Sequence, residues 1–140
     1  MRLLIDTNIY IEYLLKRENY NDVRSFFRFA LTRHNQTYVT AMSLRDIGYV
    51  VHRYTHDLEV TKKLQLQVYS MASKVIDISA DAAIESLYSD ANDYEDSLQL
   101  IAAEESMCDA IITFDKKGFT KSKLPVFTPS EILNVWLNEQ

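Results

Sequence analysis

Two aspartates stand directly after short apolar segments that are predicted to form buried strands. Residues 3–5 (Leu-Leu-Ile) precede Asp6, and residues 111–114 (Ile-Ile-Thr-Phe) precede Asp115. Short apolar runs bounded by polar residues are typical of strands that are buried on both faces. Sites in parallel sheets lie beyond the carboxyl ends of the strands. We therefore expect both carboxylates at the same edge of one sheet.

Two further aspartates are expected at that edge because they lie in the first turns of predicted helices. Asp96 begins a helix over 96–107, and Asp46 lies in the helix that follows a strand at 38–40. In crossover connections a helix starts where the preceding strand ends. The chain is thus predicted to bring together four carboxylates, those of Asp6, Asp46, Asp96 and Asp115.

Four carboxylates in one place repel one another strongly unless a cation lies between them. Oxygen ligands with few histidines and no cysteine cluster favour a hard ion such as Mg²⁺ or Mn²⁺. Such ions activate bound water and hold phosphate oxygens for in-line displacement. The pattern therefore predicts metal-assisted hydrolysis of a phosphodiester.

The same acidic residues also have structural interpretations. Aspartate is a favoured N-cap, a role open to Asp6, and Asp96 could simply add negative charge to a helix start. Asp93 and Glu95 are rival ligands to Asp96 because they lie beside it. Asp109 precedes a strand, so we expect it at the opposite end of the sheet, as a structural cap.

Five other side chains have functional groups that could contribute to a site. Asp46 has a solvated helix surface as its structural alternative. Asn8 could donate to a metal-binding carboxylate and orient it, or could merely start a helix. His52 and His56 are four residues apart and could share a metal, but no third ligand is evident, so a surface pair is expected. Cys108 is expected to be a small buried residue.

Length and composition limit the remaining possibilities. The 140 residues, 47% of them hydrophobic and with a net charge of −5, are expected to form one domain over 1–140. The single cysteine excludes an internal disulfide and indicates a reducing, cytoplasmic setting. The only glycines, Gly48 and Gly118, are too few for a P-loop, a dinucleotide-binding fingerprint or a nucleophile elbow. No apolar run is long enough for a signal peptide or a membrane span.

Predicted strands and helices alternate along the chain. The predicted strands lie at 3–5, 38–40, 75–78, 110–113 and, at an edge, 126–127. The predicted helices lie at 9–15 after a Thr7 or Asn8 cap, 21–31, 43–54 after a Ser43 cap, 58–72, 81–88 after a Ser79 cap, 96–107 and 129–137, with Pro129 in the first turn and a polar turn at 90–93. This alternation predicts an α/β fold with a small, mostly parallel sheet.

A basic stretch follows Asp115 despite the acidic total. Four lysines lie within residues 116–123, namely Lys116, Lys117, Lys121 and Lys123. A local basic patch can bind phosphates while the overall charge stays negative. The alternative is a solvated loop in which Gly118 permits a tight turn. Arg45 and Arg53 are further candidates for backbone contacts.

The nine tyrosines suggest base stacking, but most are expected in the core or in a subunit interface. Tyr10 and Tyr13 are expected near the site.

Three segments together resemble the PIN-domain family, in particular the small single-domain VapC-type toxins. They are LLIDTNIYIEYL at 3–14, YVTAMSLRDIGYV at 38–50 and DYEDSLQLIAAEESMCDAIITFDKKGF at 93–119. The family places an acidic residue followed by Thr or Ser and Asn in the first. It has a second acidic residue in the middle segment, and an acidic helix followed by Thr-x-Asp in the third.

The resemblance implies a three-layer α/β/α sandwich with metal-dependent endoribonuclease activity. It matches Asp6, Asp46, Asp96 and Asp115 to the family's acidic quartet, bound to Mg²⁺ or Mn²⁺, and it implies supporting roles for Asn8 and Thr113. RNA contacts are expected from Lys116, Lys117, Lys121 and Arg45. The second acidic position is more often glutamate in the family, and Phe114 replaces a residue that is often polar or small.

The family also implies a homodimer, for which Ile47, Val50 and Val51 offer apolar helix positions, and, in toxin members, an antitoxin partner. Two alternatives remain open. The first is a Mg²⁺-dependent phosphotransfer or receiver-type domain, but that class has an acidic pair at its first strand, whereas Ile5-Asp6-Thr7 has one acid. The second is a PIN-like scaffold without catalysis that binds a partner protein.

Overall fold

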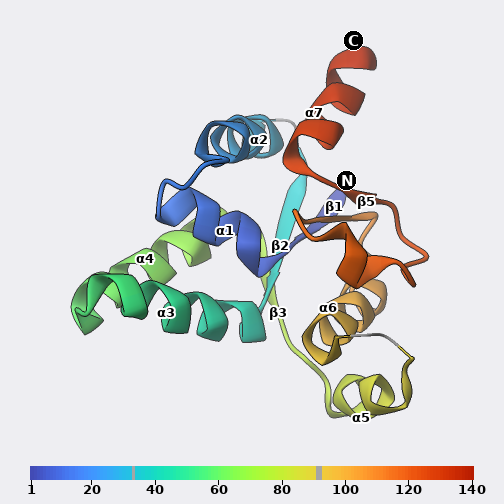
Figure 1. Ribbon diagram of the computed structural model, residues 1–140. Coiled ribbons are helices and arrows are strands. Elements are labelled where there is room, and N and C mark those ends of the chain that lie inside the picture. Colours follow the sequence, from blue (N-terminus) through green and yellow to red (C-terminus); the bar gives the residue numbers. More distant parts are fainter. Residues whose placement is uncertain (33, 91–92) are drawn as a thin grey trace.

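Five parallel strands form the central sheet of the computed structural model, which describes residues 1–32, 34–90 and 93–140 (Figure 1). Their spatial order is β3 (Lys74–Ile76), β2 (Gln36–Thr40), β1 (Arg2–Ile5), β4 (Ala110–Ile112) and β5 (Val126–Phe127). The central pair is in register with Ile5 opposite Ile112. The residues after these two strands, Asp6 and Thr113, therefore leave the sheet side by side.

Helices cover both faces of the sheet and complete three layers (Figure 1). One face carries α1 (Thr7–Leu14), α2 (Tyr20–Thr32), α3 (Ala41–Thr55), α4 (Leu58–Met71) and α7 (Pro129–Asn138). The other carries α6 (Tyr94–Glu105), with α5 (Ala80–Tyr88) packed on α6, and the short 3₁₀ helix η1 (Lys116–Phe119). The predicted α/β/α sandwich with a parallel sheet is confirmed.

Alternate residues of β1 explain how the two core regions form. Leu3 and Ile5 pack toward the larger cluster, and Leu4 packs toward the smaller one that includes Cys108. These three side chains are fully buried, which is why residues 3–5 are uniformly apolar rather than alternating. Within the described residues, no helix is both long and apolar enough to cross a bilayer.

The apolar positions of α3 belong to the core, which corrects one expectation. Ile47 and Val51 are fully buried, and Val50 packs against the same cluster. These residues therefore face the sheet and offer no subunit surface. The predicted helical spacing is confirmed, but spacing alone does not specify whether an apolar stripe faces the core or a partner subunit.

Several helix boundaries differ from the prediction because the capping side chain lies elsewhere. Asp6 caps α1, which begins at Thr7, and Thr40 caps α3 by accepting a hydrogen bond from the Ser43 backbone N–H. Ser43 is therefore inside the helix and not its cap. Asp93 caps α6, so that helix starts at Tyr94.

The remaining element predictions hold to within a few residues. Ser79 caps α5, and Pro129 lies in the first turn of α7, as expected. The third strand ends at Ile76, two residues earlier than predicted. The polar turn expected at 90–93 includes residues 91 and 92, which lie outside the described residues.

Tyr10 is fully buried in the larger core cluster, with its ring stacked on Phe27 at a centroid distance of 5.3 Å. Its hydroxyl has no hydrogen-bond partner among the described residues, and burial raises its pKa. A buried unpaired hydroxyl costs about 1–3 kcal/mol of desolvation. We therefore expect Tyr10→Phe to keep or raise the free energy of unfolding, as measured by urea denaturation. Tyr38→Phe is the control, because the Tyr38 hydroxyl donates to Gln36 Oε1 at 3.3 Å. A clear loss of stability in Tyr10→Phe alone would contradict this expectation.

Candidate active site

Asp6 stands at the carboxyl end of the central strand and is almost completely buried, with 7% of its surface exposed. Its Oδ1 accepts a hydrogen bond from the Thr7 backbone N–H at 2.8 Å, and its Oδ2 accepts one from the Thr113 hydroxyl at 2.7 Å. Burial raises the pKa of Asp6; these two bonds oppose the rise, and the charges of Asp115 and Asp93 add to it. The protein therefore fixes this carboxylate in position while it disfavours its charge.

Thr113 and Asn8 tie the ends of β1 and β4 together. The Thr113 hydroxyl also accepts hydrogen bonds from the Asp115 backbone N–H at 3.0 Å and from Asn8 Nδ2 at 3.3 Å. Asn8 Oδ1 in turn accepts a bond from the Phe114 backbone N–H at 3.3 Å. Asp115, which is exposed, is thus held on the same edge of the sheet as Asp6.

The start of α6 brings three more acidic side chains to this edge. Asp93 accepts a bond from the Asp96 backbone N–H at 3.0 Å as the helix cap. Burial, followed by the charges of Asp6, Asp93 and Asp115, raises the pKa of Asp96 to about 7. Burial and then the charge and hydrogen bond of Asp46 raise the pKa of Glu95 to about 7.

Gly118 in η1 leaves the space that the Asp96 carboxylate occupies. A Cβ at this position would collide with Oδ2 of Asp96. No glycine in the described residues has a positive φ, so the tight turn proposed for Gly118 from the sequence is not what requires it. The requirement is the close approach of η1 to the acidic helix start.

These side chains meet in a cavity of about 200 Å³ at the carboxyl edge of the sheet. Its lining comes from β1 and α1, from α6, and from the residue that follows β4. The lining residues are Asp6, Thr7, Asn8, Ile11, Asp93, Glu95, Asp96 and Asp115. None of these residues is basic, so the cavity concentrates negative charge. Three of the four predicted acids therefore lie together, and the rivals Asp93 and Glu95 lie with them.

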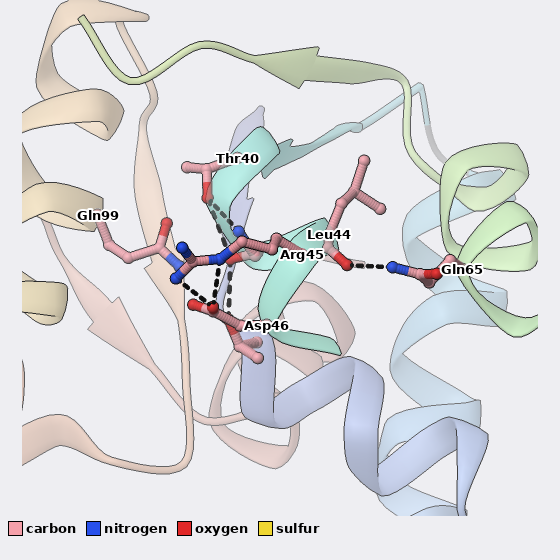
Figure 2. Close-up of polar contacts among 8 residues, drawn as sticks. Thr40, Leu44, Arg45, Asp46, Gln65 and Gln99 are labelled. Carbon is pink, nitrogen blue, oxygen red and sulfur yellow. Dashed lines mark hydrogen bonds and ion pairs between the residues drawn. The ribbon is translucent and has the colours of Figure 1, made fainter. Parts of the chain in front are cut away.

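Asp46 is not among the residues that line the cavity. Its Oδ1 accepts bonds from Arg45 Nε at 3.2 Å and Nη2 at 2.9 Å, and its side chain is 21% exposed (Figure 2). It reaches the cavity only through its hydrogen bond with Glu95. Glu95 was considered only as a rival to Asp96. The sequence does contain a sign of Glu95, because this residue lies between Asp93 and Asp96 at the acidic start of a helix.

Buried hydroxyl groups form a hydrogen-bond network next to this edge of the sheet. The Ser43 hydroxyl accepts bonds from Thr7 at 2.8 Å, from Thr40 at 3.1 Å and from Gln99 Nε2 at 2.6 Å. Figure 2 shows Thr40 and Gln99 approaching α3 from its N-terminal end, and Gln65 bonded to the Leu44 carbonyl at 2.8 Å. This network joins α1, α3 and α6, and of these helices α6 carries acidic residues in its first turn.

The basic residues that were expected to contact RNA do not line the cavity, and three of the four have acidic partners. Lys116 Nζ lies 3.0 Å from Glu131, Lys121 Nζ lies 3.0 Å from Asp90, and Arg45 pairs with Asp46. Lys117 is exposed. Exposed pairs of this kind contribute about 0–1 kcal/mol, so they exchange readily for a phosphate.

Four other residues considered from the sequence do not line the cavity. Tyr10 lies in the core, and Tyr13 packs against the same core cluster. His52 Nδ1 lies 3.4 Å from the Thr61 hydroxyl. Asp109 Oδ2 accepts a bond from the Arg2 backbone N–H at 2.6 Å, at the amino end of the strands, as expected for a structural cap.

The donor set fits a hard divalent cation. Carboxylate oxygens dominate the lining, and the raised pKa values of Asp96 and Glu95 show that their charges lack compensation. In the described part of the chain, no group of three or more Asp, Glu, His or Cys side chains is arranged to hold a metal ion as it stands. The carboxylates therefore share a cavity without being drawn to one point, because mutual repulsion opposes closure.

The raised pKa values predict how the stability of the metal-free protein depends on pH. A carboxyl group whose pKa is higher in the folded state stabilises the fold below its unfolded pKa. That contribution is lost as the pH rises through the folded pKa. For Asp96 and Glu95 the loss falls between about pH 4 and the folded value of about 7. We expect the melting temperature in EDTA to fall over this range, and to fall less in Asp96→Asn. An identical pH dependence in the two proteins would contradict the raised pKa of Asp96.

Several solved structures are similar to this chain. VapBC2 from Rickettsia felis, solved bound to a DNA fragment from its promoter, has a TM-score of 0.66 at 16% identity, with 90% of this chain and 97% of that chain covered. VapC20 from Mycobacterium tuberculosis, described as a sarcin-ricin loop cleaving toxin, has a TM-score of 0.68 at 10% identity, with 85% and 94% covered. FitAcB from Neisseria gonorrhoeae has a TM-score of 0.68 at 14% identity, with 91% and 98% covered. At these identities the structures show a shared fold.

A comparison with curated proteins found no match. The sequence model of the PIN domain, in contrast, matches residues 2–117. This match includes β1, the start of α6 and β4, which carry the acidic side chains, and it covers well over half of the chain. The protein belongs to the PIN-domain family.

Proposed function

We propose that the protein is a metal-dependent endoribonuclease that hydrolyses RNA phosphodiester bonds. The observation that carries this proposal is the acidic cavity, which Asp6, Asp96 and Asp115 reach from three separate segments. No basic side chain is among its described lining residues. Such a cavity repels an anionic substrate by itself, so its negative charge is useful to a nuclease only with a cation bound.

Asp6, Asp96 and Asp115 would hold Mg²⁺ or Mn²⁺. When bound, the ion lowers the pKa of a water molecule and offsets charge on the phosphate. Asp6 is the fixed ligand, because two hydrogen bonds set its orientation. Asp115 and Asp96 are more exposed and can move toward it. Asp46 acts from the rim, through Glu95 or a water molecule, since it does not reach the cavity directly.

Thr113 and Asn8 keep these ligands in position. The Thr113 hydroxyl contacts both Asp6 and the Asp115 backbone, so it couples the two strand ends. Asn8 contacts Thr113 and the Phe114 backbone. Partners of this kind orient metal ligands, and their loss typically reduces metal affinity or activity about 10–100-fold.

Contacts to the RNA backbone come from four basic residues outside the cavity lining. They are Lys116, Lys117, Lys121 and Arg45. Each can exchange its exposed acidic partner, where it has one, for a phosphate.

Two structural relatives were solved as complexes with a partner, and they extend the proposal to a biological role. VapBC2 and a toxin–antitoxin complex from Klebsiella pneumoniae share the fold, the latter with a TM-score of 0.64. We infer that this protein is the toxin of such a pair, active in the cytoplasm, with an antitoxin as a partner, and that it forms a homodimer. A short neighbouring gene for a DNA-binding protein would support the pairing, and sedimentation would test the dimer.

The direct test is incubation of the purified chain with labelled RNA and DNA, in EDTA and in Mn²⁺. We expect RNA fragments in Mn²⁺ and none in EDTA. Cleavage that persists in EDTA would contradict a metal mechanism. No cleavage of any RNA, together with retention of a partner protein, would favour the scaffold alternative. A phosphoryl group retained on Asp6 after incubation with acetyl phosphate would favour the phosphotransfer alternative.

A further inference from the structure

The exposed face of α3 is basic and aromatic in a protein of net charge −5. After the first residue of the helix, its exposed positions are Arg45, Tyr49, His52, Arg53 and Tyr54, and none of them is acidic. Positions 45, 49 and 53 follow one another at a spacing of four, so they lie on one side of the helix. We call Arg45, Tyr49 and Arg53 the α3 track.

Tyr49 lies in the middle of the track with 68% of its surface exposed. The Arg53 guanidinium carbon lies 5.9 Å from the centroid of its ring. On the other side, Tyr49 lines a hollow of about 390 Å³ with Arg45 and Asp46. Two helical turns separate the arginines, which corresponds to about 12 Å along the axis. Tyr54 is also exposed, at 61%, but it already has a basic partner, because Arg17 donates to its hydroxyl at 2.7 Å and lies 5.0 Å from its ring.

The track begins at the rim of the acidic cavity. Arg45 places two of its donors on Asp46 (Figure 2). Asp46 is in turn hydrogen bonded to Glu95, which lines the cavity. The Arg45 side chain is 80% exposed, and a guanidinium has five N–H donors. It can therefore keep its bond to Asp46 and still contact a phosphate.

We propose that the α3 track binds the single-stranded RNA that leads into the cavity, with Arg45 and Arg53 on phosphates and Tyr49 stacked on a base. The inference rests on the proposed nuclease function and adds the path of its substrate. Basic grooves with interleaved aromatic rings bind single strands without strict sequence preference, because every base has a face to stack. Arginine also stacks on bases and binds phosphate through bidentate hydrogen bonds.

A nucleic acid fits this face better than a second copy of the chain does. A two-fold interface brings the same patch of two subunits together, so it would gather the four arginines of two tracks in one interface. The lysines after Asp115 are the rival path, but the aromatic residue of that stretch, Phe119, is buried and offers no ring for a base to stack on. Among the described residues, the ion pair of the α3 track involves Asp46, at the end of the track nearest the cavity.

The test is a binding measurement that does not depend on cleavage. Fluorescence anisotropy of a labelled unstructured oligouridine RNA is recorded in EDTA with the full chain and its variants. We expect Tyr49→Ala to weaken binding about tenfold, within the range for one stacked base, and Tyr49→Phe to retain it. Arg53→Ala is expected to reduce the slope of log affinity against log salt by about 0.7, the value for one phosphate contact on a single strand.

Matched controls are Tyr69→Ala on α4, where the tyrosine is 61% exposed, and Arg24→Ala on α2, which is also exposed. Neither is expected to change RNA affinity. Undiminished binding in both track variants, or no binding of RNA by the unaltered chain, overturns the track. Loss of self-association in sedimentation, with RNA affinity unchanged, overturns it in favour of a second copy. Track-dependent binding without any cleavage in Mn²⁺ would refute the nuclease proposal and leave the track standing.

Discussion

Asp6→Asn is expected to abolish RNA cleavage while the protein remains folded. The carboxylate is buried, is fixed by Thr7 and Thr113, and stands at the centre of the acidic cavity. Asparagine keeps the size and one acceptor oxygen but removes the charge that a divalent ion requires. We expect a loss of activity on the order of a thousandfold, comparable to other losses of electrostatic stabilisation at active sites. The measurement is the initial rate of RNA cleavage in Mn²⁺.

Stability provides an independent readout for the same variant. Because burial raises the pKa of Asp6, its charged form is unfavourable in the metal-free protein. Asp6→Asn is therefore expected to melt at the same or a higher temperature at pH 7 in EDTA. Asp109→Asn is the matched control, since Asp109 lies at the opposite end of the strands and contacts the Arg2 backbone. Undiminished cleavage by Asp6→Asn would refute the assignment of the site.

Gly118→Ala is expected to reduce activity at least tenfold with little effect on folding. The new Cβ would collide with the carboxylate of Asp96, which is the end of a side chain and can rotate away. The fold therefore tolerates the change, because the backbone at Gly118 does not have a positive φ. The carboxylate, however, loses its place in the cavity. Cleavage rates and Mn²⁺ affinity measure the effect, and urea denaturation measures the stability.

Gly48→Ala is the matched control for this substitution. A Cβ at Gly48 would collide with the Gln65 amide, which bonds to the Leu44 carbonyl where α4 packs on α3. We expect a modest loss of stability there and unchanged cleavage. Equal activity in Gly118→Ala and the unaltered protein would show that the position of Asp96 at η1 is unimportant for the reaction.

The sequence was sufficient to predict the strand ends and the architecture. Asp6 and Asp115 follow uniformly apolar segments, and such segments indicate buried parallel strands whose carboxyl ends share an edge. The order of strand and helix also predicts the start of the 96–107 helix at this edge, from local pattern and general rules of chain crossing. The choice of Asp96 over Asp93 and Glu95 rests on the resemblance to the PIN-domain family.

Other features depend on contacts between distant segments, which pattern alone does not specify. Lys116 meets Glu131 and Lys121 meets Asp90, so much of the apparent lysine patch is paired. Ile47 lies in the core because α3 turns that face toward the sheet. Asp46 is not among the residues that line the cavity, and its carboxylate is paired with Arg45. The helix that carries it is capped by Thr40, about one turn earlier than predicted.

The reason for Gly118 was also hidden from the sequence. A lone glycine in a basic stretch is typical of a turn, whereas the structure places it against a carboxylate that lies 22 positions earlier in the chain. Only the packing of η1 on α6 makes that approach visible.

Calorimetric titration of Mn²⁺ into the protein at pH 7 tests the central claim most directly. If the carboxyl edge of the sheet is a cation site, the unaltered chain and Asp109→Asn will bind the ion, and Asp96→Asn will bind it at least tenfold more weakly. Protons will be released on binding, since the pKa of Asp96 lies near 7 in the metal-free protein. No measurable binding, or equal binding by Asp96→Asn, would contradict a metal-dependent nuclease centred on these residues.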